Sequence, residues 1–127
     1  MSLALSVSGA SDVARAIREA QDRAQDAVQA VVERYADAIA REAKGFAPVD
    51  TGALRGSIRT ALSRFSADIL AGDDEITYAA FVELGTINAA AQPFLAPAFE
   101  ANRAPFVRDL KAAVVAAVSG NPAGGVR

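Results

Sequence analysis

The feature that most limits the fold is a run of helical periodicity from Ser11 to Lys44. Apolar residues recur there every three or four positions, and no proline or glycine interrupts them. This spacing is typical of one stripe of a single helix. The stripe would contain Val13, Ile17, Ala20, Ala24, Ala27 with Val28, Val31, Tyr35, Ile39 and Ala43. Ser11 is suited to cap the start, and Gly45 followed by Pro48 is suited to end the helix.

The length of this helix has a consequence for the whole chain. A continuous helix of about 34 residues would be roughly 50 Å long, whereas a compact globule of this size is only about 35–40 Å across. A straight helix would therefore project from the body and would need a partner for its stripe. The alternative is a helix that breaks near Gln25 or Arg34 and folds back on itself.

Short segments flank the long helix. Leu3, Leu5 and Val7 alternate with small or polar residues, which predicts a half-buried strand. Residues 58–62 and 65–70 read as two strands with a turn near Ser63, and a second turn is expected at 72–74. Residues 76–84 form an apolar run that is either a strand or a short buried helix, with Tyr78, Phe81 and Val82 inside.

A second helix is predicted after Pro93 and Pro97, because proline is favoured in the first turn of a helix. Its apolar face would contain Phe99, Phe106, Leu110, Val114 and Ala117 with Val118. Pro105 should kink or restart this helix, and Gly120 should end it. The expected fold is α+β: an N-terminal strand, a long helix, a small antiparallel sheet, and a C-terminal helix packed on the sheet. Residues 1–118 would form one domain and residues 119–127 a loose tail.

Composition excludes several kinds of chemistry. The chain has no Cys and no His, which removes disulfides, thiolate nucleophiles, His-ligated metals and His acid–base catalysis. A net charge of −2 gives no reason to expect binding to nucleic acid by bulk electrostatics, and we expect no sequence-specific nucleic-acid partner. No apolar run could span a bilayer, and residues 1–10 lack the features of a signal peptide. We therefore expect no cofactor, no metal and no membrane partner.

The tetrapeptide at residues 50–53, Asp-Thr-Gly-Ala, allows one enzymatic interpretation. It resembles the active-site turn of homodimeric retroviral-type aspartic proteases, in which two close carboxylates share a proton and activate water. The context does not fit, because that fold is nearly all strand and here the tetrapeptide follows a long helix. A motif this short needs its structural context, so the protease is an alternative and we expect no enzyme.

Three blocks in order carry a different resemblance. Residues 49–58 read V-D-T-G-A-L-R-G-S-I, residues 78–86 read Y-A-A-F-V-E-L-G-T, and residues 92–99 read Q-P-F-L-A-P-A-F. Together they resemble the tail-component (neck or tail-completion) family of HK97-type long-tailed bacteriophages, with Leu84 where an aromatic residue is commoner. The residues that carry the blocks are Asp50, Gly52, Leu54, Tyr78, Glu83, Gly85, Pro93 and Phe94.

The resemblance implies a structural virion protein made in the cytoplasm of a host bacterium. Such proteins form homo-oligomeric rings at the head–tail junction or tail end, where they complete the tail and join it to the head. The implied partners are further copies of the chain, with a hexamer as the first guess, and neighbouring neck and tail-tube proteins. A generic oligomeric adaptor is the alternative within the structural class.

The charge order is compatible with a ring. Three bases, Arg55, Arg59 and Arg64, fall in a stretch without acids, and four acids, Asp68, Asp73, Asp74 and Glu75, follow in a stretch without bases. A basic edge and an acidic edge suit head-to-tail contacts between copies. The alternatives are simple solvation of both edges, or pairing within one hairpin.

Two carboxylates have predicted structural roles. Asp50 is placed to cap a short helix over residues 51–57. Glu83 lies among apolar residues, so it should be bonded to Arg55 or to backbone N–H groups. The alternative for Glu83 is that its side chain points to water.

Overall fold

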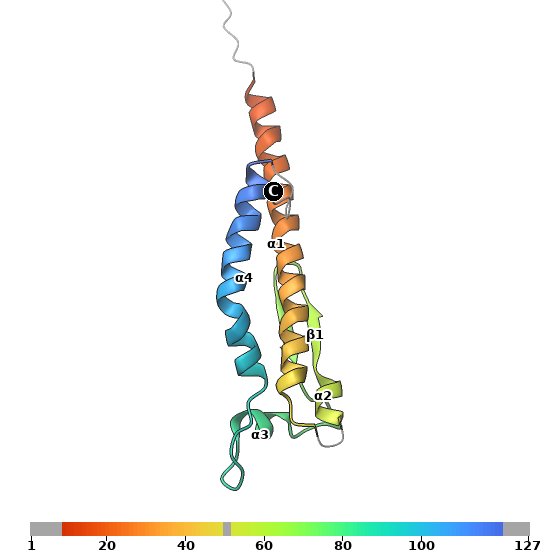
Figure 1. Ribbon diagram of the computed structural model, residues 1–127. Coiled ribbons are helices and arrows are strands. Elements are labelled where there is room, and N and C mark those ends of the chain that lie inside the picture. Colours follow the sequence, from red (N-terminus) through yellow and green to blue (C-terminus); the bar gives the residue numbers. More distant parts are fainter. Residues whose placement is uncertain (1–8, 50–51, 121–127) are drawn as a thin grey trace, which may run out of the picture.

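The computed structural model describes residues 9–49 and 52–120. Its longest element is a single N-terminal helix. Helix α1 (Ala10–Phe46) is continuous over 37 residues, which corresponds to about 55 Å. Figure 1 shows it running along most of the molecule. The continuous helix is thus confirmed over the broken alternative. The predicted strand at Leu3–Val7 lies outside the described residues.

The ends of α1 differ from the predicted ones. Gly9, with a φ of 92°, occupies the N-cap position, so the prediction of a Ser11 cap is wrong. At the other end the helix continues through Gly45 to Phe46, and Ala47 is extended with a ψ of 133°. The physical reason is Pro48, because the residue before a proline disfavours helical conformation. The prediction that Gly45 ends the helix is therefore wrong.

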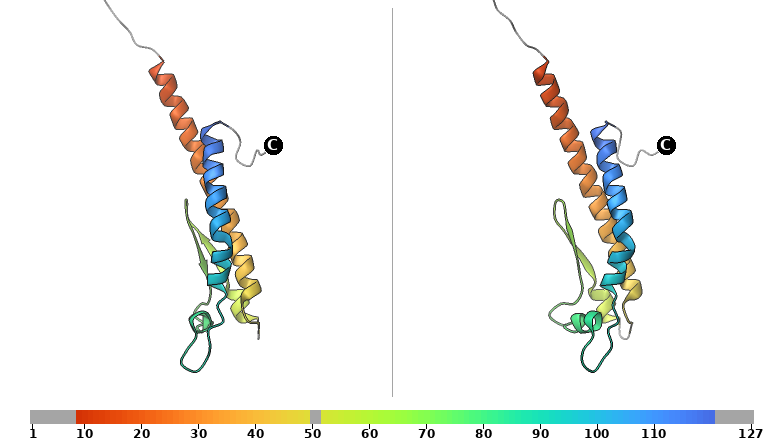
Figure 2. Two further views of the ribbon diagram at one scale, coloured as in Figure 1. Left: turned by 60° about the vertical axis from the view of Figure 1, so that its left-hand side comes forward. Right: turned by 90° about the vertical axis from the view of Figure 1, so that its left-hand side faces the viewer.

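Helix α4 (Leu95–Val118) lies antiparallel to α1 along most of its length (Figures 1 and 2). Pro105 lies inside α4 and does not restart it. Polar contacts join the two helices at three levels: Arg23 with Ala117, Tyr35 with Asp109, and Glu42 with Asn102. The helix partner of α1 is therefore α4, which ends beside Arg23 and leaves the first turns of α1 uncovered.

The sheet is a two-stranded antiparallel hairpin. Strands β1 (Arg59–Leu62) and β2 (Ala67–Leu70) pair with Thr60 opposite Ile69 and Leu62 opposite Ala67. A hydrogen bond of 2.8 Å from Ser63 N–H to the Ser66 carbonyl closes the turn. The hairpin packs against α1 and not under α4, so the predicted packing of the C-terminal helix on the sheet is wrong. The α+β class itself is confirmed.

The hydrophobic core lies at one end of the helix pair. Phe94 is completely buried there, surrounded by the C-terminal turns of α1, helix α2 (Ala53–Ser57), helix α3 (Ala79–Leu84) and the start of α4. Small residues of both helices, such as Ala43 and Ala98, let the backbones approach closely. The run at 76–84 is a helix, but Tyr78 and Phe81 are exposed and only Ala79 is buried. Their predicted burial is wrong, because a single six-residue helix covers the core with one face.

Candidate assembly site

The first sequence block, residues 49–58, packs at the end of the molecule that contains the hydrophobic core. Leu54 and Ile58 are buried, and the buried Ser57 hydroxyl donates to the Leu54 carbonyl at 2.6 Å. The same hydroxyl accepts the Gly72 N–H at 2.8 Å. Arg59 then donates to the carbonyls of Ser57 and Gly72, at 2.9 and 2.8 Å. The block therefore ties α2 to the loop that follows β2.

Glu83 connects the second and third blocks. Its carboxylate accepts the N–H groups of Phe94, Leu95 and Ala96, at 3.1, 2.7 and 3.3 Å. These N–H groups are free donors because they stand at the start of α4, and an anion there also interacts favourably with the helix dipole. The prediction that Glu83 is bonded is confirmed, with the backbone as its partner and not Arg55.

Gly85 shapes the loop between these two blocks. Its φ is +77°, and a Cβ added there would lie 2.7 Å from the backbone nitrogen of Ala91. The loop folds back so that Gln92 N–H donates to the Val82 carbonyl at 2.8 Å. The second block requires a glycine because the returning chain occupies the space of a side chain.

The remaining block residues have varied positions. Asp50 lies outside the described residues, and α2 begins one residue after Gly52, which has a φ of 84°. Tyr78 occupies the N-cap position of α3. Pro93 is exposed and precedes the buried Phe94. All three blocks thus meet at the core end, where their described residues hold the loops and the α4 start together.

The seven residues of the two charge blocks are all exposed. Arg59 bonds its own backbone, as above, and Arg64 donates to Gln25 at 3.0 Å and lies over the Phe65 ring. Asp73 accepts the N–H groups of Glu75 and Ile76 and so closes its own turn. No ion pair joins the basic block to the acidic block within residues 9–49 and 52–120.

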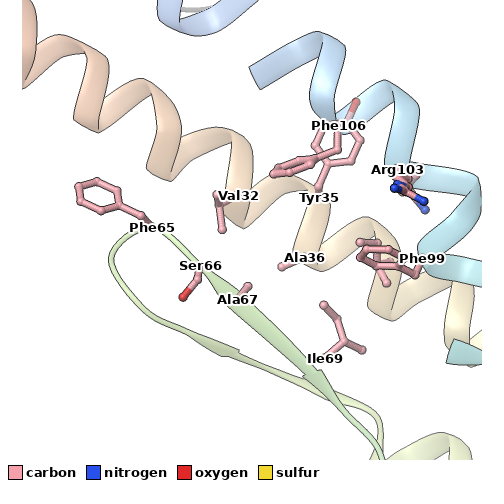
Figure 3. A pocket seen from close by; sticks show the side chains of 12 residues that line it. Val32, Tyr35, Ala36, Phe65, Ser66, Ala67, Ile69, Phe99, Arg103 and Phe106 are labelled. Carbon is pink, nitrogen blue, oxygen red and sulfur yellow. The ribbon is translucent and has the colours of Figure 1, made fainter. Parts of the chain in front are cut away.

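An apolar groove separates the hairpin from α4. It has a volume of about 280 Å³ and its floor is formed by α1. Figure 3 shows Phe65, Ala67 and Ile69 on the hairpin side and Phe99 and Phe106 on the α4 side. The aromatic rings of Phe65 and Phe99 remain about half exposed. We call this feature the hairpin groove.

Residues 11–85 match the family described as "Bacteriophage HK97-gp10, putative tail-component". The chain belongs to this family. The matched span covers most of α1, then α2, the hairpin and α3, and it ends at Gly85, before α4. No match was found among curated proteins or among solved structures.

The tail-component chain offers little support for a protease. Its described residues are mostly helical, with two four-residue strands, whereas the retroviral-type fold is nearly all strand. Among the same residues no group of three or more acids is arranged to hold a metal ion. None of the helices in residues 9–49 and 52–120 is both long and hydrophobic enough to span a bilayer.

Sequence reasoning missed two polar contacts between the long helices of this tail component. Asn102 is buried and donates to Glu42 at 2.9 Å and to the Ala98 carbonyl at 2.8 Å. The Tyr35 hydroxyl donates to Asp109, which raises the pKa of Tyr35 and lowers that of Asp109. Tyr35 also meets Phe106 edge to face at 5.4 Å between ring centroids. Asn102 and Asp109 are seven residues apart, so they fall on the same face of α4 as its buried residues. This spacing is the sequence signal that could have identified them.

Proposed function

We propose that this tail component is a ring subunit at the head–tail junction or tail end, where it completes the tail and joins it to the head without catalysing a reaction. Membership of the tail-component family carries the proposal. A hexamer is the expected ring, because tail tubes of this class resemble sixfold stacks. The expected partners are further copies, neck proteins and tail-tube proteins.

Two surfaces of the chain support contacts between copies. At the start of α1, Val13 and Ile17 are 60% and 62% exposed although they continue the apolar stripe. At the core end, Phe81, Leu84 and Ile87 are exposed together around α3 and its following loop. Large exposed apolar side chains of this kind are typical of interaction surfaces. Because the two surfaces lie at opposite ends of α1 (Figure 1), they suit contacts between different patches of neighbouring copies.

The two charge blocks supply the orientation in this proposal. The basic block of one copy would face the acidic turn of the next, and such complementarity fixes register between partners. Arg59 is a poor residue for the test because it bonds the backbone of its own chain. Arg55 is exposed on α2 and Asp74 is exposed in the loop that follows β2, so this pair is preferred.

The test is charge reversal followed by counting the protein in purified particles. Arg55→Glu should reduce incorporation, and Asp74→Arg in the same chain should restore part of it. Lys111→Glu is the matched control, since Lys111 is exposed on α4 and belongs to neither block. If Arg55→Glu and Lys111→Glu particles contain equal amounts of the protein, the charge contact is wrong. If the wild-type protein is absent from particles, the ring function itself is wrong.

A further inference from the structure

The hairpin groove exposes an unpaired strand edge next to an apolar surface. Thr60 of β1 lines a separate hollow with Asp37 and Arg41, on one side of α1. Ala67 and Ile69 of β2 line the hairpin groove on the α4 side. The edge of β2 that does not pair with β1 therefore faces the groove, and among the described residues no third strand covers it.

A two-stranded ribbon with an open edge readily accepts another strand. Isolated hairpins are marginal in water, and an exposed edge offers backbone donors and acceptors to an added segment. The groove beside β2 is lined mostly by apolar and aromatic side chains, and its polar members are Ser66, Asn102 and Arg103. It would suit a short strand that has one apolar face and no charge.

The chain contains one segment of this kind. Leu3, Leu5 and Val7 alternate with Ala4, Ser6 and Ser8, and residues 1–8 carry no charged side chain. Beside β2, such a segment could turn its three large side chains into the groove. Its small or polar side chains would then face water, as the period of a strand requires.

The segment cannot reach the groove of its own chain. The groove spans Val32 to Ile39 on α1. Val32 is 23 residues beyond Gly9, the N-cap of α1, and a helical rise of about 1.5 Å per residue puts it roughly 35 Å away. Even fully extended, the link from Leu3 to Gly9 spans at most about 20 Å. The occupant must therefore come from another copy.

We propose that residues 3–7 of one copy form a strand against β2 of its neighbour, with Leu3, Leu5 and Val7 in the hairpin groove. This contact rests on the proposed ring function and names the segment that links the subunits. The donor segment precedes the start of α1, whereas the acceptor groove lies in its second half. The contact is therefore head to tail, which is the type that closes a ring or extends a filament.

The experiment uses the absence of natural cysteines in the chain. Leu5→Cys is combined with Ala67→Cys, and the assembled particles are oxidised and analysed by non-reducing electrophoresis. A disulfide forms only when the two Cα atoms come within about 7 Å. The expected result is a ladder of linked subunits longer than a dimer. Because the proposal does not fix which residue of the added strand lies opposite Ala67, Leu3→Cys and Val7→Cys are also each combined with Ala67→Cys.

The matched controls are Ala4→Cys and Ser6→Cys, each with Ala67→Cys, because their side chains lie on the opposite face of the proposed strand. They should give much less product. A ladder of equal intensity from both sets, a linked product that stops at the dimer, or a disulfide within one chain would overturn the proposal. The melting temperature of Ala67→Cys checks that the hairpin remains folded.

A second variant separates this inference from the ring function. Leu5→Asp would place a charge in the groove and should abolish incorporation into particles, whereas Ser6→Asp should be tolerated. If Leu5→Asp is incorporated like the wild type and no disulfide ladder forms, the strand contact is wrong while the ring function stands. If the wild-type protein is not found in particles, the ring function fails first.

Discussion

At the scale of single residues, side chains of the sequence blocks make hydrogen bonds that join neighbouring segments around the hydrophobic core. Ser57 satisfies the Gly72 N–H, and Glu83 satisfies the first N–H groups of α4. Each is a side chain from one segment that pairs with the backbone of another. Such contacts hold loops that have little apolar surface of their own. The described block residues are thus structural parts of the fold.

Glu83 provides the sharpest test of that role. Glu83→Ala should lower the free energy of unfolding by about 1–3 kcal/mol, because it leaves helix-terminal donors unpaired. Glu83→Gln should lose less, since its amide oxygen still accepts one of the bonds. Glu75→Ala removes an exposed carboxylate and serves as control. Chemical denaturation measures all three, and equal stability of Glu83→Ala and wild type would refute the capping role.

The contact between Tyr35 and Asp109 predicts a dependence on pH. The Tyr35 hydroxyl holds the pKa of Asp109 below its ordinary value. A lowered carboxyl pKa stabilises the fold above the unfolded-state pKa, and this stability is lost as the pH falls through the folded-state pKa. Tyr35→Phe should therefore be less stable than wild type near neutral pH, and the difference should shrink in acid.

The measurement is the denaturation midpoint from about pH 7 down to about pH 3, the range in which a carboxylate titrates. Tyr78→Phe is the control, because Tyr78 is exposed at the N-cap position of α3 and lies far along the chain from Tyr35. A gap between Tyr35→Phe and wild type that stays constant over this range would contradict the proposed coupling.

At the scale of elements, the sequence could predict where helices and strands lie but not which elements pack together. Periodicity located α1 and both strands of the hairpin to within a few residues. The partner of α4 was missed, because an apolar stripe indicates a buried face and not the element that covers it. The burial of Asn102 was missed for a related reason. A polar residue is stable on a buried face only with hydrogen-bond partners, and the sequence does not show that Glu42 and the Ala98 carbonyl lie within reach.

Two glycines give opposite predictions at this scale. Gly85→Ala should destabilise strongly, because φ is positive and the added Cβ would meet the Ala91 backbone at 2.7 Å. Gly45→Ala should stabilise by up to about 0.5–1 kcal/mol, since Gly45 lies in the last turn of α1, where alanine is still favoured over glycine, and open space surrounds this site. Thermal melts of both variants test the pair. A stabilising Gly85→Ala would refute the account of the loop.

At the scale of the whole molecule, the folded body covers only part of α1. Helix α4 ends near Arg23, and the preceding 13 residues of α1 project about 20 Å beyond it. The apolar stripe changes character at this point. Val31 is 4% exposed on the part of α1 that runs beside α4, while Ile17 is 62% exposed on the projecting part. The projecting part keeps an apolar stripe that residues 9–49 and 52–120 of its own chain leave exposed, as expected if a neighbour completes the burial.

That contrast yields a prediction that separates folding from assembly. Ile17→Ser should leave the unfolding midpoint of the dilute protein nearly unchanged, because the residue is exposed and the two side chains have similar helix propensity. It should nevertheless reduce incorporation into particles, since a hydroxyl would replace an apolar contact with the neighbour.

Val31→Ser is the matched control on the same stripe. It removes a buried side chain and should lower stability by about 1–3 kcal/mol before any assembly occurs. If Ile17→Ser is incorporated normally, the neighbour does not cover this stripe. If Ile17→Ser instead destabilises the dilute protein as much as Val31→Ser does, the stripe is already buried without a neighbour.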